Sequence, residues 1–249
     1  MTYCCGILVE GGLVMIADTR TNAGLDNIST FRKLHIFEAP GEYVVMLAAS
    51  GNLSVTQSVV SLLKDGVENK ETGEVERLSD MKSMFQAAQL VGRAVRASRA
   101  LAGDAVEQVS GVSFEVTLLL GGQIRAEPPR LFMIYTPGNF IECTTDAPFF
   151  QIGEHKYGKP ILDRAVSYET DLYDALKIGL ISMDSTIRSN LSVGLPIDLA
   201  VLRRDALKIE TSTRITADDP YFGALRDSWS RALRAAHMAI PRPPYGGDR

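Results

Sequence analysis

The chain groups its secondary-structure patterns in pairs, and this grouping constrains the possible folds more than any other feature of the sequence. Two pairs of short apolar runs are each joined by a tight, glycine-containing turn: 2–9 with 12–18, and 33–39 with 43–50. Runs of this length, joined by so few residues, predict antiparallel β-hairpins. The polar, turn-rich segment between the two hairpins, residues 19–32, is predicted to be a loop.

Helical patterns follow the hairpins. Asn52 can cap a helix that starts at residue 53, and Ser79 is the predicted cap of a long helix that ends near Ala102. Residues 66–78, between these helices, are charged and without periodicity, and are predicted to be a surface loop. The later elements are, in chain order, predicted strands 112–122, 130–138, 140–145 and 149–153, helices 157–166 and 170–187 (the second capped by Thr170 or Asp171), strands 196–205 and 207–215, and a last helix opened by Asp219 and Pro220.

Hairpins that alternate with paired helices predict an α+β fold in which helices cover two antiparallel sheets on both sides. No internal repeat and no linker interrupts the pattern. Residues 1–249 are therefore predicted to form a single domain. Residues 241–249 are rich in proline and glycine and are predicted to be a mobile tail.

Composition and charge exclude several classes of protein. The net charge is −4 and basic residues are spread along the chain, whereas nucleic-acid binders gather lysine and arginine in one patch. Cys4, Cys5 and Cys143 are too few, and odd in number, for a disulfide framework. No apolar run approaches the roughly 20 residues that cross a bilayer, and no signal-peptide pattern is visible. We therefore expect a cytoplasmic protein that binds neither nucleic acid nor membrane.

Thr2 directly follows the initiator methionine, so removal of Met1 would make it the first residue. A threonine hydroxyl is a weak nucleophile and needs a neighbouring base. A free α-amino group, with an ordinary pKa of roughly 7.7–8.0, becomes such a base when its pKa falls slightly. Position alone is weak evidence, because many proteins carry a small second residue without any catalytic role.

Two charged residues strengthen the hypothesis for Thr2. Asp18 ends the second predicted strand, and Lys33 starts the third. If these strands are neighbours in one sheet, the reversals of the hairpins bring Thr2, Asp18 and Lys33 to one edge of that sheet. The charge of Lys33 would then lower the pKa of the Thr2 amine, and Asp18 would hold Lys33 in place. The alternative interpretations are that Asp18 is a turn residue and Lys33 a solvated strand end.

The sequence around these three residues resembles a known family. Thr2, "DTR" at 18–20, "RKLHIF" at 32–37 and "LAASGN" at 47–52 resemble a proteasome β subunit, which belongs to the N-terminal nucleophile hydrolases. The segments "TNAGLDNISTFRKLHIF", "GEHKYGKPILDR" and "SMDSTIRSNLSVGLPIDL" resemble more specifically the bacterial Anbu (ancestral β subunit) family of proteasome-type proteases. The resemblance implies a four-layer αββα sandwich, which fits the predicted order of elements.

The resemblance also implies roles for individual residues. Thr2 would be the nucleophile, Lys33 the lysine that lowers the pKa of its amine and hydroxyl, and Asp18 the carboxylate that orients this lysine. Arg20 matches the arginine in the Asp-x-Arg motif of proteasome β subunits. A purely structural role for Arg20 in the loop is equally consistent with the sequence.

Supporting groups are assigned by the same resemblance. A backbone N–H for the oxyanion hole is expected just after the second hairpin, at Gly51 in preference to Ala49 or Ser50. In the Asp-x-x-Ser-Gly motif of proteasome β subunits, Ser192 matches the serine, whereas Ser189 stands at the aspartate position.

Two departures from the family pattern put efficient peptide hydrolysis in doubt while leaving the nucleophile intact. Asp184, upstream of Ser189, could compensate for the missing aspartate or could lie in solvent. Glu154 or His155 stands where proteasome subunits carry the serine of a Gly-Ser-Gly turn.

The function implied by the resemblance is that of a threonine peptidase that cleaves peptides or small proteins inside a homo-oligomeric ring or spiral. Two alternatives stay open: a narrow amidase for a small or isopeptide-like substrate, and a non-catalytic assembly scaffold. No Cys/His cluster has metal-ligand spacing and no glycine-rich segment forms a phosphate loop. We therefore expect no metal and no cofactor, and any use of ATP has to come from a partner.

Overall fold

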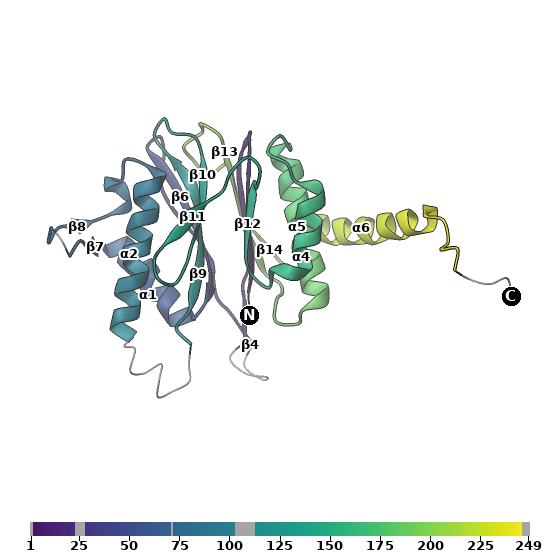
Figure 1. Cartoon of the computed structure of the whole chain (residues 1–249), viewed down its shortest axis with the longest axis horizontal. Helices are drawn as coiled ribbons and strands as arrows, with labels where there is room; N and C mark the ends of the chain where they lie inside the picture. Colours follow the sequence, from purple (N-terminus) through teal and green to yellow (C-terminus); the bar gives the residue numbers. More distant parts are fainter. Residues whose placement is uncertain (1, 23–27, 71, 103–112, 246–249) are drawn as a thin grey trace.

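The computed structural model describes residues 2–22, 28–70, 72–102 and 113–245. Within these residues, the longer strands form two five-stranded sheets in which all neighbours are antiparallel. The sheets stack face to face, and helices cover the outer face of each (Figure 1). This arrangement is a four-layer αββα sandwich, so the predicted fold class is confirmed.

The first sheet contains both strands of the N-terminal hairpin. Its strand order is β12-β1-β2-β13-β14, with β12 (Phe149–Gly153), β1 (Tyr3–Val9), β2 (Gly12–Asp18), β13 (Ile197–Arg203) and β14 (Thr211–Ile215). Its outer face is covered by α4 (His155–Ala165) and α5 (Leu172–Ser189).

The second sheet contains the second predicted hairpin. Its order is β11-β10-β9-β6-β5, with β11 (Phe140–Glu142), β10 (Arg130–Ile134), β9 (Val116–Ile124), β6 (Tyr43–Gly51) and β5 (Leu34–Ala39). Helices α1 (Leu53–Asp65) and α2 (Met84–Ala102) cover its outer face.

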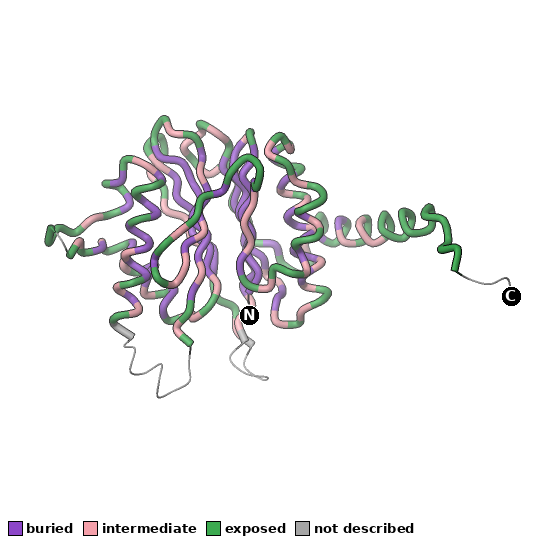
Figure 2. The backbone as a smooth tube through the Cα atoms, viewed as in Figure 1, coloured by how far each residue is buried: buried purple, intermediate pink, exposed green. Residues whose placement is uncertain are grey.

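Strands β1 and β2 are buried at every position, which explains why their sequences are continuous apolar runs. Successive side chains point to opposite faces of a strand. Tyr3 and Cys5 accordingly pack under α4 and α5, whereas Cys4 packs between the two sheets. Both faces of the sheet are covered, so neither carries a polar alternation; Figure 2 shows this buried centre between partly exposed helices.

The predicted helix caps are mostly confirmed. The side chains of Asn52, Asp171 and Asp219 each accept backbone N–H groups at the start of a helix. The prediction for Ser79 is wrong, because this residue lies in a short 3₁₀ turn (Leu78–Asp80). The following helix starts only at Met84, where the hydroxyl of the preceding serine accepts the Gln86 N–H at 3.2 Å.

Both segments predicted as loops contain short hairpins instead. Residues 19–32 hold β3 (Arg20–Asn22) and β4 (Ile28–Thr30), and residues 66–78 hold β7 (Val67–Glu68) and β8 (Val75–Glu76). Each of these strands pairs only with the other member of its hairpin. Such ribbons are held by backbone hydrogen bonds, which leave no apolar alternation in the sequence to detect.

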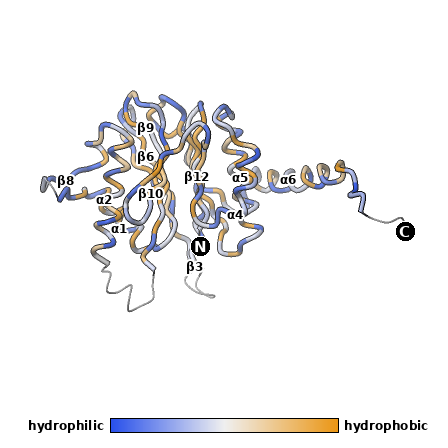
Figure 3. Tube along the Cα trace, in the orientation of Figure 1, coloured by the Kyte–Doolittle hydropathy of each residue, from blue (hydrophilic) through white to orange (hydrophobic). Residues whose placement is uncertain are grey.

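The last helix, α6 (Pro220–Ala239), leaves the body of the molecule (Figure 1). Its buried residues are Phe222 and Leu225, near its start, whereas residues 231–240 are all exposed. Hydrophobic positions nevertheless recur along the projecting part (Figure 3). In the predicted tail, residues 241–245 are exposed, and residues 246–249 lie outside the described residues. No helix among the described residues is long and apolar enough to cross a membrane.

Candidate active site

Asp18 and Lys33 form a buried ion pair. Lys33 Nζ lies 2.8 Å from Asp18 Oδ1, and the two side chains are 6% and 0% exposed. The same ammonium group donates to the carbonyl oxygen of Arg20 at 2.6 Å. The backbone N–H of Tyr3 donates to Asp18 Oδ1 at 3.0 Å. The pair is therefore connected by a hydrogen bond to the peptide that joins Thr2 to Tyr3.

The two charges meet across the sandwich and not along one sheet. Asp18 ends β2 in the first sheet, whereas Lys33 directly precedes β5 in the second. The expectation that Thr2, Asp18 and Lys33 lie at the edge of one sheet is therefore wrong. They gather because the sheets are stacked and the relevant strand ends lie at the same end of the stack. Thr2 itself is 7% exposed at this end.

Burial dominates the electrostatics of the ion pair. Burial raises the pKa of Asp18 above its ordinary value, while the charge and hydrogen bond of Lys33 oppose this shift. The backbone N–H groups of Tyr3 and Gly194 favour the ionised form in the same way. The carboxylate therefore depends on these neighbours for its charge.

The carbonyl group of Thr2 is held by the segment that leads into α4. The N–H of Glu154 donates to Thr2 O at 2.7 Å, and Glu154 is the residue that caps α4. A Cβ atom on Gly153, which has a φ of +80°, would lie 1.9 Å from this oxygen and 3.2 Å from Ser50 Oγ. Glycine is thus required for the chain to approach Thr2 so closely. His155 is exposed and its Nδ1 lies 3.1 Å from the Gly153 carbonyl oxygen.

Arg20 supports the turn that follows α5. Its Nη1 donates to the carbonyl oxygen of Leu191 at 2.9 Å, and its guanidinium group lies against Gly194. In the same turn, the N–H of Ser192 donates to Asn190 Oδ1 at 2.9 Å. Arg20 therefore contacts the loop whose Gly194 N–H favours the ionised form of Asp18.

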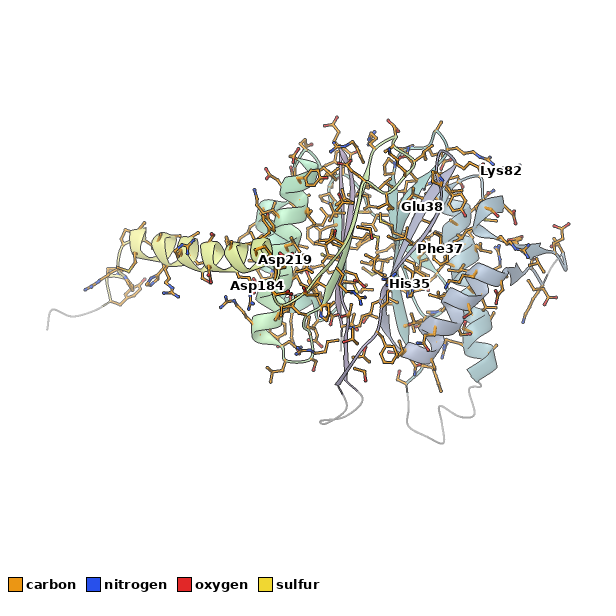
Figure 4. All side chains as sticks on the ribbon, turned by 180° about the vertical axis from the view of Figure 1, so that it is seen from behind. His35, Phe37, Glu38, Lys82, Asp184 and Asp219 are labelled. Atoms are coloured by element: carbon orange, nitrogen blue, oxygen red, sulfur yellow. The ribbon has the colours of Figure 1, made fainter. Side chains whose placement is uncertain are left out.

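Two further residues considered from the sequence lie on α5. Ser189 is exposed at the end of α5. Asp184 is buried, and its two carboxylate oxygens accept from Arg188 Nε at 3.0 Å and from Arg226 Nε at 2.6 Å. It neither lies in solvent nor takes the place of the missing aspartate, because its carboxylate joins α5 to α6; Figure 4 labels it near the root of α6.

The end of β6 narrows the choice of a backbone donor for an oxyanion. The N–H of Ala49 donates to the carbonyl oxygen of Lys33 at 3.1 Å and is therefore occupied. Gly51 is exposed and has a φ of +108°, and a Cβ atom there would lie 2.2 Å from Glu115 O. Only glycine fits this position, whichever role its N–H takes.

Several groups that hold this site were not recognised from the sequence. They are the N–H groups of Tyr3, Glu154 and Gly194 and the close approach of Gly153. A backbone N–H is common to all residues except proline, so the sequence does not reveal which ones act as donors. Of these groups, only Gly153 could have been noticed from its residue type. Among the described residues, no group of three or more His, Cys, Asp or Glu side chains is arranged to hold a metal ion.

Among the comparisons with known proteins, the comparison with solved structures gives matches. No protein-family model matches the chain, and no curated protein matches it. The solved structure of Anbu (ancestral beta-subunit) from Yersinia bercovieri matches with 46% identity and a TM-score of 0.89, over 98% of this chain and 100% of that one. Anbu from Hyphomicrobium sp. strain MC1 matches with 48% identity and a TM-score of 0.87, over 97% and 99% of the two chains.

A third solved structure is described as a helical assembly of the Anbu complex from Pseudomonas aeruginosa. It shares 43% identity with this chain, covers 98% of both chains and has a TM-score of 0.90. Identities of this size, over nearly the whole of each chain, extend well beyond a shared architecture. The chain therefore belongs to the Anbu family, whose fold is that of proteasome β subunits and other N-terminal nucleophile hydrolases.

Proposed function

We propose that this protein is an N-terminal threonine hydrolase that cleaves amide bonds of peptides or small proteins by acyl transfer through Thr2. One observation carries the proposal: the buried Lys33–Asp18 pair is hydrogen-bonded to the peptide that follows Thr2. A buried ion pair is weak evidence for stability, since apolar residues of similar volume often stabilise as well. Its retention beside a potential nucleophile is better explained by chemistry.

The reaction begins once Met1 is removed and the Thr2 amine is free. The positive charge of Lys33 disfavours a second positive charge on this amine and lowers its pKa. The N-terminus of α4, whose Glu154 N–H reaches the Thr2 carbonyl, carries partial positive charge and acts in the same direction. A neutral amine then takes the proton of the Thr2 hydroxyl, directly or through a water molecule, as the oxygen attacks the substrate carbonyl.

Completion of the cycle needs no further ionisable group. The amine passes its proton to the leaving nitrogen as the C–N bond breaks, which leaves the acyl group as an ester on Thr2. Water attacks this ester with the amine again as base, the acyl C–O bond to Thr2 breaks, and the protonated amine returns the proton to the Thr2 oxygen as the free acid leaves. Asp18 stays ionised throughout and holds Lys33, while the N–H of Gly51 stabilises the developing oxyanion.

The proposal includes a homo-oligomeric ring or spiral in the cytoplasm. It is supported by the helical assembly described for the Pseudomonas aeruginosa relative. It is also supported by α6, where Leu233 and Met238 are 50% and 78% exposed, and by Ile240 directly after it, which is 69% exposed. Exposed apolar side chains on a projecting helix favour burial against another chain.

A narrow amidase is the second candidate. The observation that favours it is Ser189, which is exposed at the end of α5 and stands where proteasome β subunits carry an aspartate. At the place of the serine in the Gly-Ser-Gly turn of proteasome subunits stands Glu154 or His155, and Glu154 offers its backbone N–H to Thr2. A site with fewer supporting side chains suits one favoured substrate better than many.

Covalent labelling tests the proposal. Purified protein is first analysed by mass spectrometry for loss of Met1, and is then treated with a peptide epoxyketone or a β-lactone. We expect an adduct on Thr2, none in Thr2→Ala, and full labelling in the control Thr213→Ala on β14. Absence of an adduct in protein that has lost Met1 would falsify the proposal and favour a scaffold. An adduct without cleavage of a broad peptide library would favour the narrow amidase.

A further inference from the structure

A chain of buried hydrogen bonds lies behind the nucleophile. Tyr3 is 0% exposed, and its ring packs among the apolar residues under α4 and α5. Its hydroxyl lies 2.6 Å from Ser182 Oγ on α5 and accepts a hydrogen bond from Gln151 Nε2 on β12. Ser182 Oγ in turn lies 2.9 Å from the carbonyl oxygen of Gly158 on α4 and donates to it. The proposed mechanism uses none of these side chains.

The direction of every bond in this chain can be assigned. The single hydroxyl hydrogen of Ser182 is used on the Gly158 carbonyl, so Ser182 accepts from Tyr3. Burial raises the pKa of Tyr3 well above its ordinary value, so the phenol keeps its proton. The chain therefore runs from Gln151 to Tyr3, then to Ser182 and to Gly158.

These hydrogen bonds provide a third attachment for the segment Thr2–Tyr3. Glu154 holds the carbonyl of this peptide at 2.7 Å, and Asp18 accepts its N–H at 3.0 Å. The hydroxyl of Tyr3 adds a third, directional attachment, since apolar packing alone is non-directional. The Cα atom of Thr2, which belongs to this peptide, is thereby held in place.

The packing around the hydroxyl allows little displacement. A Cβ atom on Gly158 would lie 2.3 Å from Ser182 Oγ and 2.6 Å from Tyr3 Oη. Strand β1, helix α4 and helix α5 thus meet at this one group of atoms. A phenylalanine at position 3 could fill the same space, so the hydroxyl is not required for packing.

We propose that Gln151, Tyr3 and Ser182 are positioning residues that set the place of Thr2 for attack. This proposal rests on the proposed role of Thr2 as the nucleophile. Displacement of a reacting group by about 1 Å can cost up to roughly 100-fold in rate. Loss of this chain should therefore slow the covalent step, while substrate binding remains unchanged.

The test measures the first-order rate constant of Thr2 labelling and the half-saturating concentration of the same epoxyketone separately. We expect Tyr3→Phe to lower the rate constant about tenfold and to leave the half-saturating concentration within about twofold. Tyr173→Phe is the matched control. Tyr173, on α5, is 44% exposed, and its hydroxyl bonds to Glu210 at 2.8 Å and takes no part in the hydrogen bonds from Gln151 to Gly158. It should label at the wild-type rate.

A double variant separates positioning from stability. Ser182→Ala alone leaves the Tyr3 hydroxyl buried without an acceptor and should lower the melting temperature. Tyr3→Phe combined with Ser182→Ala removes both hydroxyls, so the melting temperature should recover toward that of wild type while labelling stays slow. A double variant that is stable and labels at the wild-type rate overturns the proposal.

Failure of the proposed function can be told apart from failure of this inference. If wild-type protein gives no adduct, the function of Thr2 is wrong, and amide hydrogen exchange decides the positioning role. Faster exchange at the Tyr3 and Glu154 amides in Tyr3→Phe, with the Tyr173→Phe control unchanged, supports it. Equal protection of these amides in Tyr3→Phe and wild type overturns it.

Discussion

The molecule contains two buried aspartates that look alike by exposure and differ in their surroundings. Asp18 and Asp184 are both 0% exposed. Asp18 pairs with Lys33, whose side chain is 6% exposed. Asp184 pairs with Arg188 and Arg226, whose side chains are 50% and 33% exposed. In the first ion pair both side chains are buried, whereas in the second the aspartate is buried and its arginine partners are exposed to water.

The exposure of the cationic partner indicates which aspartate can influence chemistry and which one only connects two helices. Solvent and salt screen the arginines around Asp184, so their charges have little effect beyond the contact between α5 and α6. The charge of Lys33 is screened far less and acts on whatever lies beside it. A buried carboxylate is thus informative about function only together with the exposure of its partner.

The largest effect is expected from removal of the enclosed cation. Lys33→Ala should reduce labelling of Thr2 on the order of 10³-fold or more, because the amine loses the charge that lowers its pKa. It should also cost about 3 kcal/mol of stability, since Asp18 is left buried without its cation. Size-exclusion chromatography and thermal unfolding verify that the variant still assembles. Labelling that persists in assembled Lys33→Ala would refute the role of Lys33.

Acid should switch off the enclosed pair before it unfolds the protein. Labelling requires a neutral Thr2 amine as well as an ionised Asp18, so below the raised pKa of this carboxyl it should fall by at least tenfold per pH unit. Because the folded-state pKa lies above the unfolded one, protonation of Asp18 stabilises the fold. That contribution is full below the unfolded pKa and is lost as pH rises through the folded pKa. Labelling and circular dichroism across pH 3–7 would contradict this assignment if both signals were lost together.

The solvent-reaching pair should behave in the opposite way. Asp184→Ala should lower stability by roughly 1–2 kcal/mol, a value reduced for screening at the half-exposed arginines. Labelling of Thr2, per folded molecule, should stay within about twofold of wild type, since Asp184 has no bond to the site. Denaturant unfolding and labelling kinetics measure the two effects. A large loss of labelling with an intact fold would show that the comparison of the two aspartates is wrong.

The smallest effect is expected at Ser189, the position where proteasome β subunits carry an aspartate. Ser189 is exposed, so Ser189→Ala should change stability by less than about 0.5 kcal/mol and leave labelling unchanged. Ser189→Asp, which restores this aspartate, should be equally silent in this chain. Faster labelling in Ser189→Asp would show that an acidic group at the end of α5 acts on Thr2.

The sequence alone was sufficient for the parts of the molecule that depend on neighbouring residues. Hairpins at β1–β2 and β5–β6 follow from short apolar runs and tight turns. Helices capped by Asn52, Asp171 and Asp219 follow from side chains that satisfy nearby N–H groups. The sequence also indicated that Asp18 and Lys33 meet near Thr2, although it placed them in one sheet.

Only the tertiary structure decided how Asp18 and Lys33 meet, because their contact crosses from one sheet to the other and depends on how the sheets stack. It also decided the place of Asp184, whose partner Arg226 lies on a helix far along the chain. The backbone groups around Thr2 belong to the same class, since every residue but proline offers the same N–H. Local hydrogen bonds and apolar periodicity depend on residues close together in the sequence, whereas burial and cross-sheet contacts arise only when the layers pack.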